Sequence, residues 1–168
     1  MDPEKVSIEA MLHAHWKDVA AIYQEGMDTG YATFEKIVPP WEAFDASHLK
    51  IGRAVAMLNR KVVGWAALSP VSSRCVYGGV AEVSIYVTRS KRGIGIGRQL
   101  MQHLIDESER HGYWTLQSGI FPENRASIAL HEKMGFRVLG FRERIGKRDG
   151  VWKDNVQLER RSKIVGTN

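Results

Sequence analysis

The chain has 168 residues, of which 43% are hydrophobic and 26% charged, and its formal net charge is +5. These values suit one soluble domain, and no run of about 18 apolar residues could cross a membrane. A single cysteine, Cys75, excludes an internal disulfide framework, and no Cys/His group has metal-ligand spacing, so we expect no metal. The first residues hold no apolar signal core. We therefore expect one cytoplasmic domain, residues 1–168, with a loose tail at about 162–168.

The positive charge is concentrated in the second half. Residues 1–80 carry eight Lys/Arg and nine Asp/Glu, whereas residues 81–168 carry sixteen and ten. A basic half indicates either a solvated surface or a bound acidic ligand. Nucleic acid is not expected as a partner, because no recognition motif accompanies the charge.

The first 80 residues alternate between strand and helix patterns. Residues 6–11 predict a strand, and helical spacing of apolar residues predicts a helix over 16–27. Pro39 and Pro40 precede a short helix over 41–49. Two strands, 53–58 and 62–68, are joined by a turn at 59–61. The segments 29–38 and 69–79 are expected to be irregular loops, and the aromatic residues of the first either line a substrate pocket or cover the core.

The second half begins with an alternating strand over 81–87, in which Glu82, Ser84 and Tyr86 share one face. A helix follows Gly97 and ends at Gly112, and a strand covers 114–120. Asn124 begins another helix, with Ile128, Ala129, Leu130 and Met134 facing inward. Strands over 136–145 and 151–160 flank a turn at 147–150. This order predicts a mixed α/β sheet with helices on both faces.

A glycine-rich turn precedes the first helix of this half, with three glycines in residues 93–97. Free N–H groups at the helix start, together with the helix dipole, form an anion site suited to a pyrophosphate. The turn lacks the Lys-Ser/Thr of a nucleotide P-loop and the N-terminal βαβ unit of a dinucleotide fold. Taken alone, it predicts only an anion.

Two segments together resemble the GCN5-related N-acetyltransferases (GNAT). Arg92-Gly93-Ile94-Gly95-Ile96-Gly97 matches the acyl-CoA signature of that family, and Asn124-x-x-Ser127-x-x-Leu130-His131-x-Lys133-x-Gly135-Phe136 matches a second motif. Within the family, the chain is most similar to phosphinothricin and methionine sulfoximine acetyltransferases. That likeness rests on Glu82 at a strand start, on His131 where most members have Tyr, and on Arg74-x-x-Tyr77. The resemblance covers nearly the whole chain and implies a mostly antiparallel sheet that is splayed at the acetyl-CoA site.

The resemblance implies acetyl transfer from acetyl-CoA to the primary amine of a small amino-acid-like substrate. Glu82 would take the proton of the amine, directly or through a water, although the strand pattern alone favours a solvent-facing residue. His131 would protonate the leaving thiolate or orient the amine or Glu82. Alternatively, it is a helix histidine bonded to the backbone.

Cofactor contacts follow from the same resemblance. The strand would hold the thioester arm and supply a backbone N–H to the oxyanion, the turn would bind the pyrophosphate, and Asn124 would contact the pantetheine amides or cap its helix. The implied contacts are Ser84, Ile85, Tyr86, Val87, Arg92, Gly93, Ile94, Gly95, Ile96, Gly97, Arg98, Asn124 and Ser127.

For the acceptor, Arg74 would bind a carboxylate bidentately, or it is an ordinary exposed arginine. Tyr77 lies beside it in sequence, and Thr33, Phe34 and Glu35 would form another pocket wall. The alternatives are a GNAT that acts on a peptide, a protein or another amine, and a non-catalytic acyl-CoA sensor. A homodimer is expected from the family. The apolar residues Val151, Trp152 and Val156 would then form an interface, or else they belong to the core.

Overall fold

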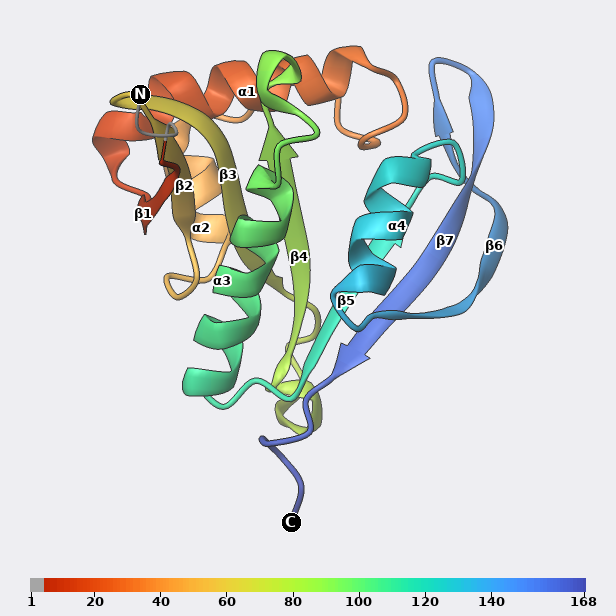
Figure 1. The fold of residues 1–168 in the computed structure, drawn as a ribbon. Helices are drawn as coiled ribbons and strands as arrows, with labels where there is room; N and C mark the ends of the chain where they lie inside the picture. Colours follow the sequence, from red (N-terminus) through yellow and green to blue (C-terminus); the bar gives the residue numbers. More distant parts are fainter. Residues whose placement is uncertain (1–4) are drawn as a thin grey trace.

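A computed structural model describes residues 5–168, so the first four residues of the predicted domain lie outside the described part. The predicted order of helices and strands is confirmed (Figure 1). The strands are β1 Ser7–Ala10, β2 Ala54–Leu58, β3 Lys61–Pro70, β4 Val80–Val87, β5 Thr115–Ile120, β6 Arg137–Arg148 and β7 Val151–Arg161. The helices are α1 Trp16–Asp28, α2 Trp41–Ser47, α3 Ile96–Arg110 and α4 Arg125–Lys133.

Where bounds differ from the prediction, local contacts give the reason. β3 extends to Pro70 because Ser69 and Pro70 still pair with β4. The helix α2 stops at Ser47, where the Ser47 hydroxyl and the His48 ring both donate to the Phe44 carbonyl. The predicted loop 69–79 contains a 3₁₀ turn, Cys75–Tyr77. On α4, Ala129 is exposed rather than inward-facing, because this helix buries only His131 fully.

The seven strands form one sheet in the order β1-β2-β3-β4-β5-β7-β6. Every neighbouring pair is antiparallel except β4 and β5, which confirms a mixed, mostly antiparallel sheet. The parallel pair is short: Val80–Glu82 pair with Thr115–Gln117, and pairing then stops. Beyond these residues the two strands diverge and split the sheet into two arms (Figure 1).

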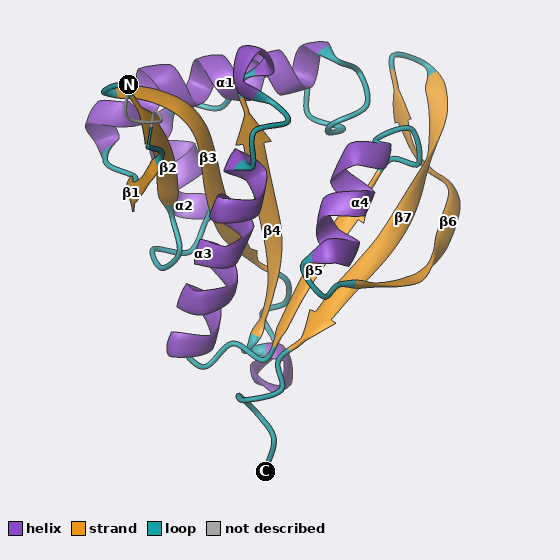
Figure 2. Cartoon of the chain, in the orientation of Figure 1, coloured by secondary structure: helices purple, strands orange, loops and turns teal. Residues whose placement is uncertain are grey.

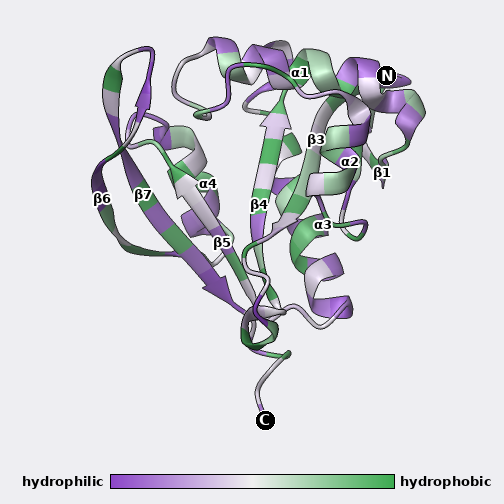
Figure 3. Cartoon of the chain, turned by 180° about the vertical axis from the view of Figure 1, so that it is seen from behind, coloured by the Kyte–Doolittle hydropathy of each residue, from purple (hydrophilic) through white to green (hydrophobic). Residues whose placement is uncertain are grey.

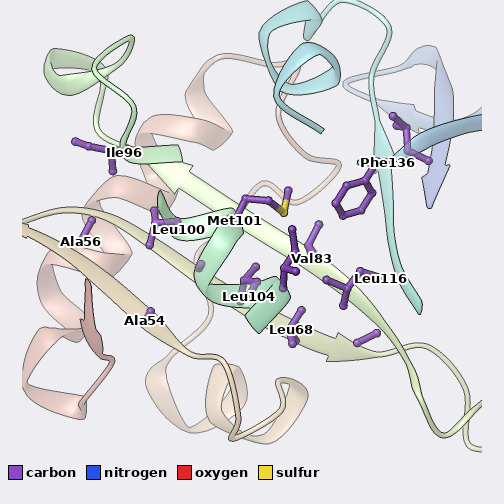
Figure 4. Close-up of a cluster of buried hydrophobic side chains, with 14 of the residues drawn as sticks. Ala54, Ala56, Leu68, Val83, Ile96, Leu100, Met101, Leu104, Leu116 and Phe136 are labelled. Carbon is purple, nitrogen blue, oxygen red and sulfur yellow. The ribbon is translucent and has the colours of Figure 1, made fainter. Parts of the chain in front are cut away.

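Helices cover both faces of the sheet, as predicted (Figure 2). On one face, α3 and α4 pack on a core that includes Leu100, Leu104 and Phe136 (Figure 4). On the other face, α1 and α2 enclose a second core around the fully buried Trp65 and Phe44. Successive side chains of β4 point to opposite faces, so Val83 belongs to the first core and Tyr86 packs against the second. Hydrophobic and hydrophilic residues alternate along this strand (Figure 3).

The chain ends without regular structure after Arg161. The Arg161 guanidinium donates to the carbonyls of Ser162, Val165 and Gly166. No helix within residues 5–168 is both long and apolar enough to span a membrane.

Candidate active site

A cleft of about 950 Å³ is lined by both diverging strands. Residues 82–87 of β4 all contribute to it, as do Ser118, Gly119 and Ile120 of β5. Because successive strand residues point to opposite faces of a sheet, a cleft lined by six in a row passes through the sheet. It therefore has one mouth on the α3/α4 face and another on the α1/α2 face.

The glycine turn forms part of the α3/α4 mouth. Gly93 and Gly95 have φ of +81° and +89°, and a Cβ on either would meet no other atom within 4 Å. Gly95 is the N-cap of α3, so the first N–H groups of this 15-residue helix, which have no partner within the helix, lie beside this open space. Open space beside free N–H groups and the positive end of a helix dipole can accommodate a phosphate group.

The predicted cofactor residues are almost all brought together here. The cleft lining includes every one of them except Ile94 and Arg98, which are exposed and lie outside it. Lys91, which the motif does not include, also contributes to the lining.

The helix α4 supplies two polar groups to the same mouth. The Asn124 side chain accepts a hydrogen bond from the Ser127 N–H at 3.3 Å, so Asn124 caps the helix while lining the cleft. His131, only 4% exposed, donates from Nδ1 to the Ser127 carbonyl at 2.7 Å. Its Nε2 is buried and has no partner among the described residues. Burial lowers the pKa of His131, while the bond to Ser127 acts in the opposite direction. In the neutral ring that burial favours, Nε2 is an acceptor.

Glu82 stands at the point where the sheet divides. It pairs with Ser69 on β3 and with Gln117 on β5, and it is the last residue of β4 to pair with β5. Its carboxylate is exposed and accepts a long 3.5 Å hydrogen bond from Gln117. Because Glu82 shares its face of β4 with Tyr86, which packs against the core under α1 and α2, the carboxylate lies at the α1/α2 mouth, where solvent can reach it.

Tyr86 anchors the wall of this mouth two pleats farther along β4. Its ring stacks on the Trp65 ring with the ring centroids 4.8 Å apart, and its hydroxyl is hydrogen-bonded to the Thr33 side chain. Burial raises the pKa of Tyr86 far above its ordinary value, so the phenol stays protonated. The loop residue Thr33 is thereby fixed against the strand.

The loop that carries Thr33, Phe34 and Glu35 also contacts the β6–β7 hairpin. Phe34 packs edge-to-face on Phe121 at 4.6 Å, and a Cβ on Gly146 of β6 would lie 2.8 Å from the Phe34 ring. At the hairpin tip, Arg148 donates to the Met27 carbonyl at 2.6 Å and Asp149 pairs with Lys36. All three predicted wall residues line the cleft.

The other two predicted acceptor residues lie elsewhere. Arg74 and Tyr77 are exposed beside the 3₁₀ turn, with the guanidinium 5.5 Å from the Tyr77 ring centroid, and neither lines the cleft. The sequence analysis missed Arg142, Asn155 and Gln157, which do line it. Asn155 and Gln157 had a detectable signal, because they are the polar positions that alternate with Val156 and Leu158 on β7. Arg142 had none.

Comparison with known proteins places the fold in a known family. The model of the acetyltransferase (GNAT) family matches residues 11–136. An L-methionine sulfoximine/L-methionine sulfone acetyltransferase of Salmonella typhimurium is 36% identical over 57% of this chain and 56% of that protein. A phosphinothricin N-acetyltransferase of Alcaligenes faecalis is 30% identical over 84% of this chain and 75% of that protein.

Solved structures agree with this assignment. A GNAT-superfamily phosphinothricin acetyltransferase from Sinorhizobium meliloti, in complex with acetyl-CoA, has a TM-score of 0.86 at 28% identity, covering 97% of this chain and 91% of that one. The chain spans little more than half the length of the first of the curated relatives that it matches. The family match nevertheless covers most of the described residues, including both strands that diverge around the cleft, so the chain belongs to the acetyltransferase (GNAT) family.

Proposed function

We propose that the chain transfers acetyl from acetyl-CoA to the primary amine of a small amino-acid-like substrate. The supporting observation is one cleft that holds the glycine turn at one mouth and Glu82 at the other. The names of the relatives, which specify methionine sulfoximine, methionine sulfone and phosphinothricin, support this acceptor class.

The residues on the α3/α4 face fit acetyl-CoA. Gly93 and Gly95 leave space for a pyrophosphate beside free N–H groups, and the orphaned Nε2 of His131 provides a buried acceptor. When bound, acetyl-CoA supplies the activated acetyl group. Asn124 and Ser127 would bind the pantetheine arm, and a backbone N–H of residues 84–87 would stabilise the oxyanion, an effect typically worth about 3 kcal/mol.

Glu82 is proposed as the general base. An amine is protonated at neutral pH and cannot attack until it loses a proton, which a carboxylate can accept directly or through a water. Because Glu82 is exposed and Gln117 is its only partner among the described residues, it can then release the proton to solvent.

His131 is proposed to accept a hydrogen bond rather than to act as an acid. Its Nδ1 proton is committed to the Ser127 carbonyl, and its lowered pKa disfavours the imidazolium that an acid would require. A neutral Nε2 can accept an N–H or S–H from a group that enters the cleft and thereby orient it.

The test is thiol release from acetyl-CoA across a panel of amines, with wild type, Glu82→Gln and Glu9→Gln. Glu9 is an exposed strand glutamate on β1, outside the cleft. We expect turnover with methionine sulfone or phosphinothricin, a loss of about 10²- to 10⁴-fold in kcat for Glu82→Gln, and none for Glu9→Gln. Turnover with peptides or polyamines alone would reject the acceptor class. Acetyl-CoA binding without any turnover would favour a sensor.

A homodimer is also proposed. Val156 belongs to the core, but Val151 and Trp152 are 57% and 53% exposed on β7, which leaves apolar surface at the hairpin end. We expect Trp152→Glu to convert a dimer into a monomer in sedimentation velocity. A wild-type monomer at micromolar concentration would reject this proposal.

A further inference from the structure

Arg142 of β6 is the only Lys or Arg among the described residues that lines the cleft outside the glycine turn. Lys91 and Arg92 belong to the glycine turn, so Glu35, Glu82 and Arg142 are the remaining Asp, Glu, Lys and Arg side chains of its lining. On the same strand as Arg142, Arg137 pairs with Glu159 and Arg148 donates to a backbone carbonyl. The Arg142 guanidinium has no such bond among the described residues, so it can bind an anion that enters the cleft.

A register shift in β6 between Val138 and Gly140 places Arg142 opposite Asn155, and a second irregularity follows directly after Arg142. The register passes from Arg142 opposite Asn155 to Gly146 opposite Lys153, so three residues of β6 face one residue of β7. Arg144 within this bulge has φ +48°, and its N–H donates to Asp154 at 2.8 Å. Bulges redirect side chains and occur often beside active sites. Here both Arg142 and Ile145 line the cleft.

Two amides complete the surroundings of Arg142. Asn155, directly across from Arg142, is 8% exposed, and its carbonyl oxygen accepts a hydrogen bond from the Gln157 amide. That bond leaves the Asn155 NH₂ as a donor for a ligand. A Cβ on Gly119 would lie 2.8 Å from the Asn155 oxygen and 3.0 Å from the Gln157 nitrogen, so a larger residue at 119 would force this amide pair to move away from β5.

We propose that Arg142 and the Asn155 amide form the subsite that binds an oxyanion of the acceptor substrate. An arginine fork matches a carboxylate bidentately, and an amide N–H adds a further donor. Donors on the β6–β7 arm and the acidic Glu82 on the β4 arm together suit a substrate that carries both an amine and an acid group. The subsite rests on the proposed function and replaces the expectation that Arg74 binds the acid group.

The test is the equilibrium affinity of three acceptors, measured by titration calorimetry with acetyl-CoA absent. Methionine sulfone carries only an α-carboxylate, its carboxamide carries none, and phosphinothricin adds a distal phosphinate. The variants are Arg142→Gln, Arg142→Lys and the control Arg137→Gln, which lies on β6 outside the cleft. Because Arg142 is exposed and the ion pair of Arg137 with Glu159 lies at the surface, all three variants should melt close to wild type.

We expect Arg142→Gln to weaken the binding of methionine sulfone about 10- to 100-fold and that of the carboxamide less than about twofold. For methionine sulfone, the affinity of Arg142→Lys should lie between those of wild type and Arg142→Gln. If Arg142→Gln weakened the binding of phosphinothricin but left that of methionine sulfone unchanged, the same subsite would be supported but assigned to the distal phosphinate. The proposal would be overturned if Arg142→Gln weakened the binding of methionine sulfone and of its carboxamide equally, or weakened the binding of none of the acceptors. It would also be overturned if wild type bound none of them, or if Arg74→Gln rather than Arg142→Gln lost the preference for the carboxylate. Absent turnover with intact binding would reject only the acetyl transfer.

Discussion

The two ends of α3 provide a matched pair of glycines that separates backbone strain from ligand binding. Gly95 caps the start of the helix with φ +89°, and Gly112 follows its end with φ +81°. A Cβ on either meets nothing within 4 Å, so alanine at each position costs only the left-handed backbone, about 1–2 kcal/mol. For a domain of this length, each variant should melt about 2–8 °C below wild type.

Only Gly95 lines the cleft, so the two variants should differ in acetyl-CoA binding. A methyl group beside the helix N–H groups would displace an anion and lose at least one charge-assisted hydrogen bond, about 1.5–3 kcal/mol. That loss corresponds to a Kd about 10- to 100-fold weaker for Gly95→Ala and unchanged for Gly112→Ala. Calorimetric titration with acetyl-CoA, paired with thermal melts, measures both quantities. Equal affinity in the two variants would refute the placement of the pyrophosphate at this turn.

Other sites allow equally direct tests. Gly146→Val should push the Phe34 ring and change the KM for the acceptor but not for acetyl-CoA, whereas Gly140→Val, which meets nothing within 4 Å on the same strand, should change neither. Asn124→Ala should lose about 1 kcal/mol in denaturant unfolding, while Asn124→Asp should keep the cap but weaken acetyl-CoA binding. Burial lowers the pKa of His48 and of His131, so the unfolded chain binds more protons. The free energy of unfolding should therefore fall as the pH drops below about 6.5, with a shallower slope in His48→Gln; a pH-independent value between 5.5 and 7.5 would contradict this.

The order of helices and strands could be predicted because its signals are local. Glycines with positive φ at 95 and 112 bound α3, and the alternation on β4 assigns each residue to a face. The α3/α4 mouth could be predicted for the same reason, since a turn and a helix start carry most of it.

The part of the cleft that we propose for the acceptor depends on contacts between distant segments. Arg142 faces the cleft because β6 bulges against β7, and no residue pattern within β6 encodes that register shift. Likewise, Arg74 follows a strand that extends past its predicted end, so the direction of its loop depends on the pairing of Pro70 with Ala81. In both cases tertiary pairing decides which side chain reaches the cleft.

The short parallel pairing of β4 with β5 affects how substrates would enter the cleft and how products would leave it. The cleft opens on both faces of the sheet. Acetyl-CoA that enters past α3 and an amine acceptor that enters past the β6–β7 hairpin would therefore use separate mouths of the cleft. Neither would block the path of the other, and an acetylated product could leave while the spent carrier is still in place. If Glu82 is the general base, as proposed, the two routes would meet at the residue where the pairing of Val80–Glu82 with β5 ends.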